Sequence, residues 1–579
     1  MKKSSTLFIV LMGIYSILPV RQAGIQPINL SAGTLVKEDQ SIIAQTKQTA
    51  FINGKIYTVN ENQPYAEAVI VEGNKIKFVG TTQEARKFID ANTEVIDLQG
   101  KLLLPGFNDS HLHFTSGGHY LLGINLRPAL SNEEFAEMIQ SYILKRSLPL
   151  SAWITGGRWD HELWQDKSLP TKELIDPFTE NTPVFVSRID GHVGLANSKA
   201  LELAGITKNT PDPAGGLIEK DEDSNPTGIL KDNAMDLVFK VIPPPSLEEN
   251  IEATLRALEE ARKLGITSVQ DMTQPGELEA YQQIMKDGKL TCRIYSIWPI
   301  DRYEDIVRAG VTVSTEEIYI KRGGLKGYAD GSLGASTAWF FESYESNPSN
   351  YGLANDVVTN GNLEKWATDA DRNRLQICIH AIGDRANSYV LDMFQKIKNI
   401  NSPWNRRFRI EHAQHLRKED INRFAEIGVI ASVQPYHCID DGVWAEKRIG
   451  SERIKTTHVY HSLIESGAVV AFGTDWPVAP LNPLYGIYAA VTRETVDGKN
   501  PDGWISSEKI SVEDAVKCYT LNSAYASFEE KIKGSIEVGK LADFVVLSDD
   551  IFSIDPDEIK NVEVEMTIFN GEIVYTVRE

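Results

Sequence analysis

A strand-then-helix pattern that recurs through most of this chain constrains its fold more than any other feature. Short apolar runs typical of buried strands appear one after another, and most precede a stretch with helical periodicity. Eight such units predict an α/β fold, the (β/α)8 or TIM barrel, in which helices surround a cylinder of parallel strands. The runs are Leu102–Asp109, Gly265–Met272, Cys292–Trp298, Leu325–Asp330, Gln376–Ile382, Arg407–Ala413, Val429–Pro435 and Ala468–Asp475.

One connection between these runs is far longer than the others. It follows the first run and covers residues of about 131–263. A compact domain seldom contains a structureless connection of that length. We therefore expect an inserted subdomain after strand one.

Two similar segments lie near opposite ends of the chain, at Phe51–Val59 and Ile568–Val577. Each has Asn-Gly between apolar residues, which predicts a hairpin. Further alternating stretches lie between Ala68 and Leu98. The economical interpretation is one small β-sandwich domain built from residues 45–104 and 540–579, with the barrel domain, 105–539, inserted between its halves.

The N-terminus predicts export. Lys2 and Lys3 precede an apolar run, Leu7–Val20, as in a secretory signal peptide. That run is shorter than the ~20 residues that span a bilayer. We assign residues 1–44 to a signal peptide and flexible leader and expect a periplasmic or extracellular protein. An uncleaved membrane anchor is the alternative.

The net charge of the chain limits the classes of partner that it is expected to bind. The 579-residue chain has a net charge of -21, which opposes binding to nucleic acid or to an anionic membrane. Its 42% hydrophobic and 24% charged residues are typical of a soluble globular protein. A small-molecule substrate is the expected partner, and a homodimer stays open.

Polar residues end several of the predicted strands, where a barrel of this kind places its active site. His111 and His113 are separated by one residue, so on a strand both face one side and can bind one metal ion together. Such a pair alone is more often an ordinary loop feature. Here the other strand ends supply further candidates: Asp109, Lys326, Asp330, His380, His412 and Asp475.

Seven segments that follow one another along the chain resemble the amidohydrolase superfamily, within its amidohydrolase 3 family and the branch of N-substituted formamide deformylase-like and YtcJ-like metal-dependent hydrolases. Together they are highly specific. They are GFNDSHLHF (106–114), DGHVGLANSKAL (190–201), LKGYADGSLGASTA (325–338), HAIGDRAN (380–387), RIEHAQ (409–414), GTDWPV (473–478) and GKLADFVVL (539–547).

The resemblance implies a metal centre. His111 and His113 would hold the more buried ion with Asp475 beside them, and His380 and His412 would complete that site or hold a second ion. Lys326 matches a position where relatives carry a carboxylated lysine that bridges two metals; the alternative is an ammonium that contacts substrate or pairs with Asp330. Zinc is the expected metal, with iron or manganese as alternatives.

The implied activity is hydrolysis of a non-peptide carbon-nitrogen bond, in an amide or an N-formyl or N-acyl amine. Asp475 is the candidate general base that moves a proton from the activated water to the leaving nitrogen. His192 and Trp476 are assigned to the substrate, His192 also as an oxyanion contact. Carbamates, esters or cyclic amides are alternative substrates, and a binding protein without catalysis is the other class. Asp109 is expected to orient His111 or His113.

Overall fold

The computed structural model describes residues 47–146, 152–189, 191–213, 215–313 and 317–577. The predicted signal peptide and leader, 1–44, lie outside these ranges. The described chain divides into two compact units: one contains residues 47–114 and 257–577, the other residues 115–256. In the described chain, no helix is both long and apolar enough to cross a membrane.

The first unit contains the predicted barrel. Eight strands form one sheet in which every paired neighbour is parallel. The sheet closes where the Asp475 N–H donates to the carbonyl oxygen of His111 at 2.7 Å. The (β/α)8 prediction is confirmed. In chain order, the strands are β8 (Phe107–Leu112), β15 (Ile266–Met272), β16 (Arg293–Pro299), β17 (Ile320–Tyr328), β18 (Gln376–Ala381), β19 (Arg409–His412), β20 (Ile430–Val433) and β21 (Val470–Phe472).

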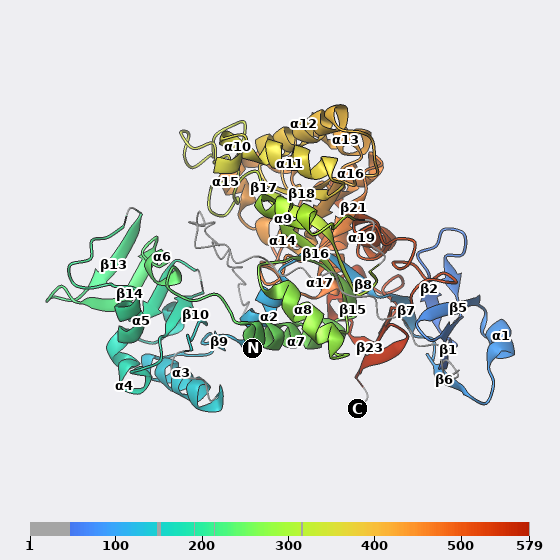
Figure 1. Ribbon diagram of the computed structural model, residues 1–579, viewed down its shortest axis with the longest axis horizontal. Coiled ribbons are helices and arrows are strands. Elements are labelled where there is room, and N and C mark those ends of the chain that lie inside the picture. The colour runs from blue at the N-terminus through green and yellow to red at the C-terminus, as the bar shows by residue number, and fades with distance from the viewer. Residues whose placement is uncertain (1–46, 147–151, 190, 214, 314–316, 578–579) are drawn as a thin grey trace. The chain divides into compact units, whose positions relative to one another are not determined.

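Helices surround these strands. In Figure 1, α11 and α12 lie along the outer side of β18, and α13 lies beside α12. The helices of this unit are α1 (Thr82–Ala85), α8 (Glu277–Lys286), α9 (Tyr303–Arg308), α10 (Asp356–Thr359), α11 (Asn362–Arg372), α12 (Asp384–Ile400), α13 (Lys418–Ile427), α14 (Pro435–Asp441), α15 (Ala445–Arg453), α16 (Tyr460–Glu465), α17 (Pro483–Thr492), α18 (Val512–Cys518) and α19 (Leu521–Ala526).

The first predicted run is divided between two sheets. Leu102–Pro105 forms β7 outside the barrel, and only the segment after Gly106 enters it as β8. A Cβ on Gly106 would lie 2.2 Å from the Thr267 Oγ1. The missing side chain therefore allows the chain to pass close to its neighbour where it changes sheets.

Both ends of the described chain contribute to a β-sandwich. Its core contains Phe51, Val69, Leu103, Phe544 and Ile568, and the rings of Phe51 and Phe544 meet edge to face at 6.0 Å. One sheet has the order β5 (Lys75–Gly80), β4 (Ala68–Glu72), β1 (Gln48–Ile52), β6 (Thr93–Asp97), and the other β24 (Glu572–Thr576), β23 (Val564–Phe569), β22 (Phe544–Leu547), β7, β2 (Lys55–Tyr57), β3 (Tyr65–Ala66).

The two Asn-Gly segments behave differently. Asn570-Gly571 joins β23 and β24 in a hairpin, as predicted. The predicted hairpin at Asn53-Gly54 is wrong, because β1 and β2 belong to different sheets. Phe51 and Ile56 both point into the sandwich core, so burying both takes the chain from one sheet to the other.

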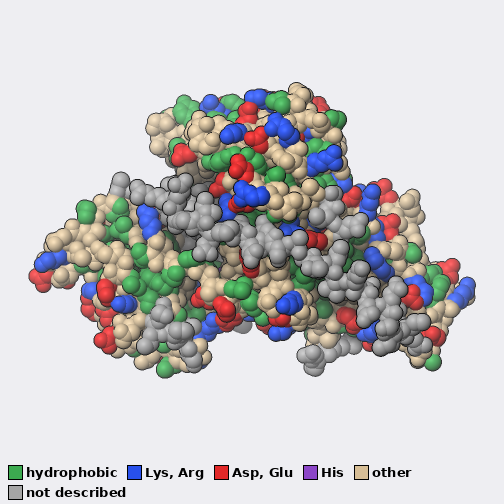
Figure 2. All heavy atoms as spheres, viewed as in Figure 1, with side chains coloured by type: hydrophobic (Ala, Val, Ile, Leu, Met, Phe, Trp, Pro, Cys, Tyr) green, Lys and Arg blue, Asp and Glu red, His purple; other side chains and the backbone are tan. Residues whose placement is uncertain are grey.

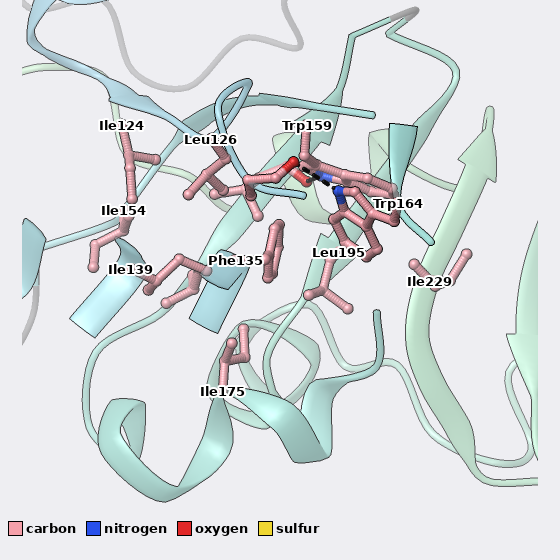
Figure 3. Packing of buried hydrophobic residues seen from close by; sticks show 13 residues of the cluster. Ile124, Leu126, Phe135, Ile139, Ile154, Trp159, Trp164, Ile175, Leu195 and Ile229 are labelled. Atoms are coloured by element: carbon pink, nitrogen blue, oxygen red, sulfur yellow. Dashed lines mark hydrogen bonds between the residues drawn. The ribbon is translucent and has the colours of Figure 1, made fainter. Parts of the chain in front are cut away.

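The second unit, 115–256, has its own sheet and core, where the sequence predicted an insertion of about 131–263. Trp159 and Trp164 are almost fully buried with Phe135, as Figure 3 shows. The Trp164 Nε1–H donates to the carbonyl oxygen of Ala129 at 2.9 Å, which satisfies the buried indole. The sheet order is β13 (Gly216–Lys220), β14 (Pro226–Asp232), β12 (Val193–Ala196), β11 (Phe185–Arg188), β10 (Gly156–Trp159), β9 (Ile124–Asn125).

The helices of this second unit are short, apart from α3. Two further helices, α2 (Phe114–Leu122) and α7 (Leu247–Lys263), cross its boundaries with the first unit. The others are α3 (Asn132–Arg146), α4 (Asp176–Thr179), α5 (Ser198–Leu203) and α6 (Asp236–Phe239).

The described surface carries both signs of charge. On the face drawn in Figure 2, Lys and Arg side chains are scattered among Asp and Glu side chains. The expectation that the chain binds no nucleic acid stays a prediction.

Candidate metal centre

Three of the predicted ligands meet where β8 and β21 end. The donor atoms of His111, His113 and Asp475 all lie within 4.8 Å of one another. Asp475 Oδ1 is 3.5 Å from the Nε2 atom of each histidine. Asp475 has a φ of 58°, a left-handed conformation that is uncommon for a side chain other than glycine. In this conformation the Asp475 N–H donates a hydrogen bond to the carbonyl oxygen of His111.

Glu411 orients the first of these histidines. The Nδ1 of His111 lies 2.5 Å from Glu411 Oε2. Since the carboxylate accepts, Nδ1 carries the proton and Nε2 keeps the lone pair that a metal needs. Burial alone would raise the pKa of Glu411, but the Arg409 guanidinium and His111 hold it well below its ordinary value.

Glu411 was not predicted as a site residue, although it lies in the RIEHAQ segment. Arg409 and Glu411 are two residues apart on one strand and form an ion pair of 2.8 Å with both side chains fully buried. Opposite charges at this spacing inside an apolar strand were the available signal, because buried charges are usually paired.

Asp475 is held as a carboxylate. Burial by itself would raise its pKa, but the neighbouring His111 and His113 side chains hold that pKa well below the ordinary value. An ionised carboxylate beside two imidazoles is suited to bind a cation or to accept a proton.

His412 approaches the same group from β19. Its Nδ1 lies 2.7 Å from Gln434 Oε1, which leaves Nε2 as the lone-pair atom. Its φ of 74° interrupts the alternation of the strand, so consecutive residues Glu411 and His412 both contribute to the site. Burial lowers the pKa of His412 well below its ordinary value, which favours the neutral imidazole that ligates metals.

His380, from the end of β18, lies beside His412, with ring centroids 4.5 Å apart. Its Nε2 is 3.1 Å from the carbonyl oxygen of Gly331. A carbonyl accepts only, so Nε2 donates and Nδ1 carries the lone pair. Burial, with a smaller effect of the Lys326 charge, lowers the pKa of His380 to about 3.

Lys326 is buried at the end of β17, with its Nζ 3.5 Å from His111 Nε2. Burial lowers its pKa to about 8, against the opposing effects of Glu411 and Asp475. The Asp330 carboxylate accepts instead from the backbone N–H groups of Trp339, Ile382 and Gly383. An ion pair between Lys326 and Asp330 is absent from the described residues.

Two buried carboxylates support the backbone around the histidines. Asp109 accepts from the N–H groups of His111 and Thr474, both at 3.1 Å, so it holds the main chain rather than an imidazole ring. Asp271 accepts from the N–H of Phe114 at 2.7 Å and from the Tyr281 hydroxyl at 2.8 Å. Asp271, which was not predicted as a site residue, fixes the main chain directly after His113.

The two expected substrate residues have separate surroundings. Trp476 packs its indole 6.3 Å from the Phe114 ring, and its carbonyl oxygen accepts from the His113 N–H at 2.8 Å. His192 belongs to the second unit, where its Nδ1 lies 2.8 Å from Asp232 Oδ1. Contact of either residue with substrate stays a prediction.

A second group of donors shares Asp475. The donor atoms of His412, His437 and Asp475 also lie within 4.8 Å of one another, and all three residues are buried. His437 lies in α14, which starts directly after β20. Two imidazoles and a carboxylate suit zinc and also admit iron or manganese. The residues present therefore fit a divalent metal.

Comparisons with known proteins agree with this chemistry. The model of the amidohydrolase family matches residues 94–575. The chain is 38% identical over 511 residues to Protein LONG AFTER FAR-RED 3 of Arabidopsis thaliana, covering 86% of each chain. It is 35% identical over 533 residues to the putative amidohydrolase YtcJ of Bacillus subtilis, covering 90% of this chain and 98% of the relative.

A further relative is the N-substituted formamide deformylase of Arthrobacter pascens, 27% identical over 552 residues, with 92% of this chain and 99% of the relative covered. Among solved structures, an uncharacterised metal-dependent hydrolase from Pyrococcus horikoshii OT3 superposes with a TM-score of 0.75 at 29% identity, covering 88% of this chain and 99% of that one. The resemblance inferred from the seven sequence segments is thus confirmed, and the chain belongs to the amidohydrolase family.

Proposed function

We propose that this protein hydrolyses the carbon-nitrogen bond of an N-formyl or N-acyl amine. The observation that carries the proposal is the group formed by His111, His113 and Asp475, whose donor atoms lie within 4.8 Å of one another at the strand ends of the barrel. The N-substituted formamide deformylase among the relatives supports the choice of substrate class.

The expected cofactor is a divalent metal, with zinc proposed, held by His111, His113 and Asp475. His380 and His412 would complete that site or hold a second ion. Such an ion polarises a carbonyl group and makes a water molecule acidic near neutral pH. The orientation of His111 by Glu411 at 2.5 Å leaves its Nε2 available to the ion.

Asp475 is the proposed general base. It is ionised because the neighbouring His111 and His113 side chains override the effect of burial on its pKa. In the reaction, the water oxygen adds to the carbonyl carbon while Asp475 takes the proton. The carbon-nitrogen bond then breaks, and the same proton passes to the leaving nitrogen, so that an acid and an amine are released.

Lys326 is proposed to be carboxylated. Only a neutral amine adds to carbon dioxide, and burial lowers the pKa of Lys326 to about 8. A neutral fraction is therefore present near neutral pH. The resulting carbamate would place anionic oxygens beside His111, where an ammonium group would repel a cation.

The remaining proposed roles concern the substrate and the location of the protein. His192 and Trp476 are proposed to contact the substrate, with His192 donating to the oxyanion. Export to the periplasm or the exterior is also proposed, on the basis of the apolar run Leu7–Val20 behind its lysines, with an uncleaved membrane anchor as the alternative.

The test is a screen of metal-reconstituted protein against N-formyl amines, N-acyl amines, carbamates, esters and cyclic amides. Released amine, or acid for the esters, is measured by chromatography, and His111→Asn serves as the inactive control. We expect turnover of the N-formyl or N-acyl compounds that is lost in the control. Turnover confined to the other compounds would refute the proposed substrate class, and no turnover by metal-loaded protein would refute the hydrolase assignment.

A further inference from the structure

His437 lies beside the group formed by His111, His113 and Asp475 and is not one of its members. It comes from α14, the seven-residue helix that follows strand β20. Its ring is nearly parallel to that of His412, at 12°, with centroids 6.4 Å apart. One of its ring nitrogens lies within 4.8 Å of a donor atom of His412 and of Asp475.

The Nε2 atom of His437 is buried and has no hydrogen-bond partner in the described part of the chain. The residue as a whole is only 8% exposed. A buried polar atom without a partner costs free energy, and in a native protein it usually indicates a bound group that satisfies it.

Two nearby buried histidines show how a purely structural imidazole is satisfied here. The ring nitrogens of His415 bond to Thr457 Oγ1 at 2.8 Å and Gln414 Nε2 at 3.2 Å. Those of His458 bond to Asp441 Oδ2 at 3.2 Å and to the hydroxyl of Tyr460 at 3.1 Å. Both nitrogens have partners in each case, so His437 differs from its structural neighbours.

Gln434 orients the ring of His412 and supports the helix that carries His437, so both histidines are placed to bind one cation. The bond from His412 Nδ1 to Gln434 Oε1, 2.7 Å, leaves the Nε2 lone pair of His412 free. The backbone carbonyl oxygen of Gln434 also accepts a hydrogen bond from the backbone N–H of His437 at 3.1 Å. The same residue therefore fixes the ring of His412 and the first turn of the helix that presents His437.

We propose that His437 is a metal ligand, and that with His412 and Asp475 it forms a second cation position adjoining the one at His111 and His113. Asp475 belongs to both groups, so its carboxylate is placed to serve both ions. The inference rests on the proposed metal centre and adds a ligand from α14, the helix that follows strand β20. Two imidazoles and a carboxylate make a ligand set suited to zinc, cobalt or iron.

The test measures metal binding and requires no substrate. Full-length protein is stripped with a chelator and titrated with Co²⁺. Bound metal is counted by elemental analysis, and affinity is measured by chelator competition. The variants are His437→Asn and His437→Ala, with His412→Asn and His111→Asn as reference ligand losses. His461→Asn, at an exposed position on α16, controls for the loss of a histidine, and thermal unfolding checks that each variant folds.

We expect wild type to bind two ions per chain. Each His437 variant should keep one ion and bind the other at least about tenfold more weakly, since even partners outside the ligand shell contribute 10- to 100-fold. Wild-type affinity for two ions in both His437 variants, with a loss in His412→Asn, would overturn the inference and leave the metal centre intact. Saturation of wild type at one ion would overturn it too. Unchanged binding in His111→Asn would instead count against the proposed metal centre itself.

Discussion

Replacing Glu411 by glutamine tests the two roles of this residue, which are to neutralise Arg409 and to orient the ring of His111. Its carboxylate accepts from Arg409 at 2.8 and 3.0 Å and from His111 Nδ1 at 2.5 Å, and no part of its side chain is exposed. Glutamine keeps the shape but is neutral and presents an NH₂ group to one of these donors. The variant therefore leaves the buried Arg409 guanidinium without its counter-charge. It also removes the carboxylate whose hydrogen bond with His111 Nδ1 fixes the tautomer of that histidine.

Both consequences have an expected size. Removing one partner of a buried ion pair costs about 3–5 kcal/mol, because the remaining charge is uncompensated. Losing the group that orients a ligating histidine lowers metal affinity by about 10- to 100-fold, or about 1.4–2.8 kcal/mol of binding free energy. The oxygen of the new amide can still accept one bond, so we expect the lower part of each range.

The assays are denaturant unfolding of the metal-free protein and Co²⁺ titration by chelator competition. Asp371→Asn is the matched control. Asp371 is a fully buried carboxylate on α11 that accepts from Arg406 Nε and Trp404 Nε1, both at 2.8 Å. It should lose comparable stability and keep its metal affinity. Wild-type affinity in Glu411→Gln, or an equal loss of affinity in both variants, would refute the orienting role of Glu411.

Three further outcomes test the site and its frame. Asp475→Asn should lower turnover at saturating metal by at least about 100-fold, whereas a loss of a few-fold would exclude it as the general base. Gly473→Ala should weaken Co²⁺ binding and lower the melting temperature, because its Cβ would lie 2.5 Å from the His111 backbone nitrogen; wild-type values would show that β21 can move away without cost. Burial raises the pKa of Asp420, but hydrogen bonds from its arginine and serine neighbours lower it below the ordinary 3.8. Its ionised form therefore stabilises the fold above that pH, and this stabilisation is lost as the pH falls further. Asp420→Asn should thus be about 1.5–3 kcal/mol less stable than wild type at pH 6 in denaturant unfolding, and a difference that stayed constant below pH 3.8 would contradict this account.

The barrel could be predicted because its signal is repeated and local. Each strand is a short apolar run, and the rule that active sites lie at the carboxyl ends of such strands selected His111, His380, His412 and Asp475 without tertiary information. The same local signal was misleading at Gly106 and Asn53, where the chain moves from one sheet to another. Which sheet a strand joins depends on pairings between residues far apart in the sequence, and a pattern of period two does not contain that information.

Residues that support the ligands could not be selected in the same way. Glu411 and Asp271 are buried carboxylates whose partners come from other strands and loops, so their roles appear only when those elements meet. His437 is a sharper case. In the sequence it is one histidine among several after strand seven, and its unsatisfied Nε2 becomes visible only once the hydrogen bonds of its neighbours are known. In this family member, the local pattern identifies the histidines that end strands, whereas hydrogen-bond satisfaction distinguishes a structural histidine from one available to a cation. The Co²⁺ titration of the His437 variants tests that criterion directly.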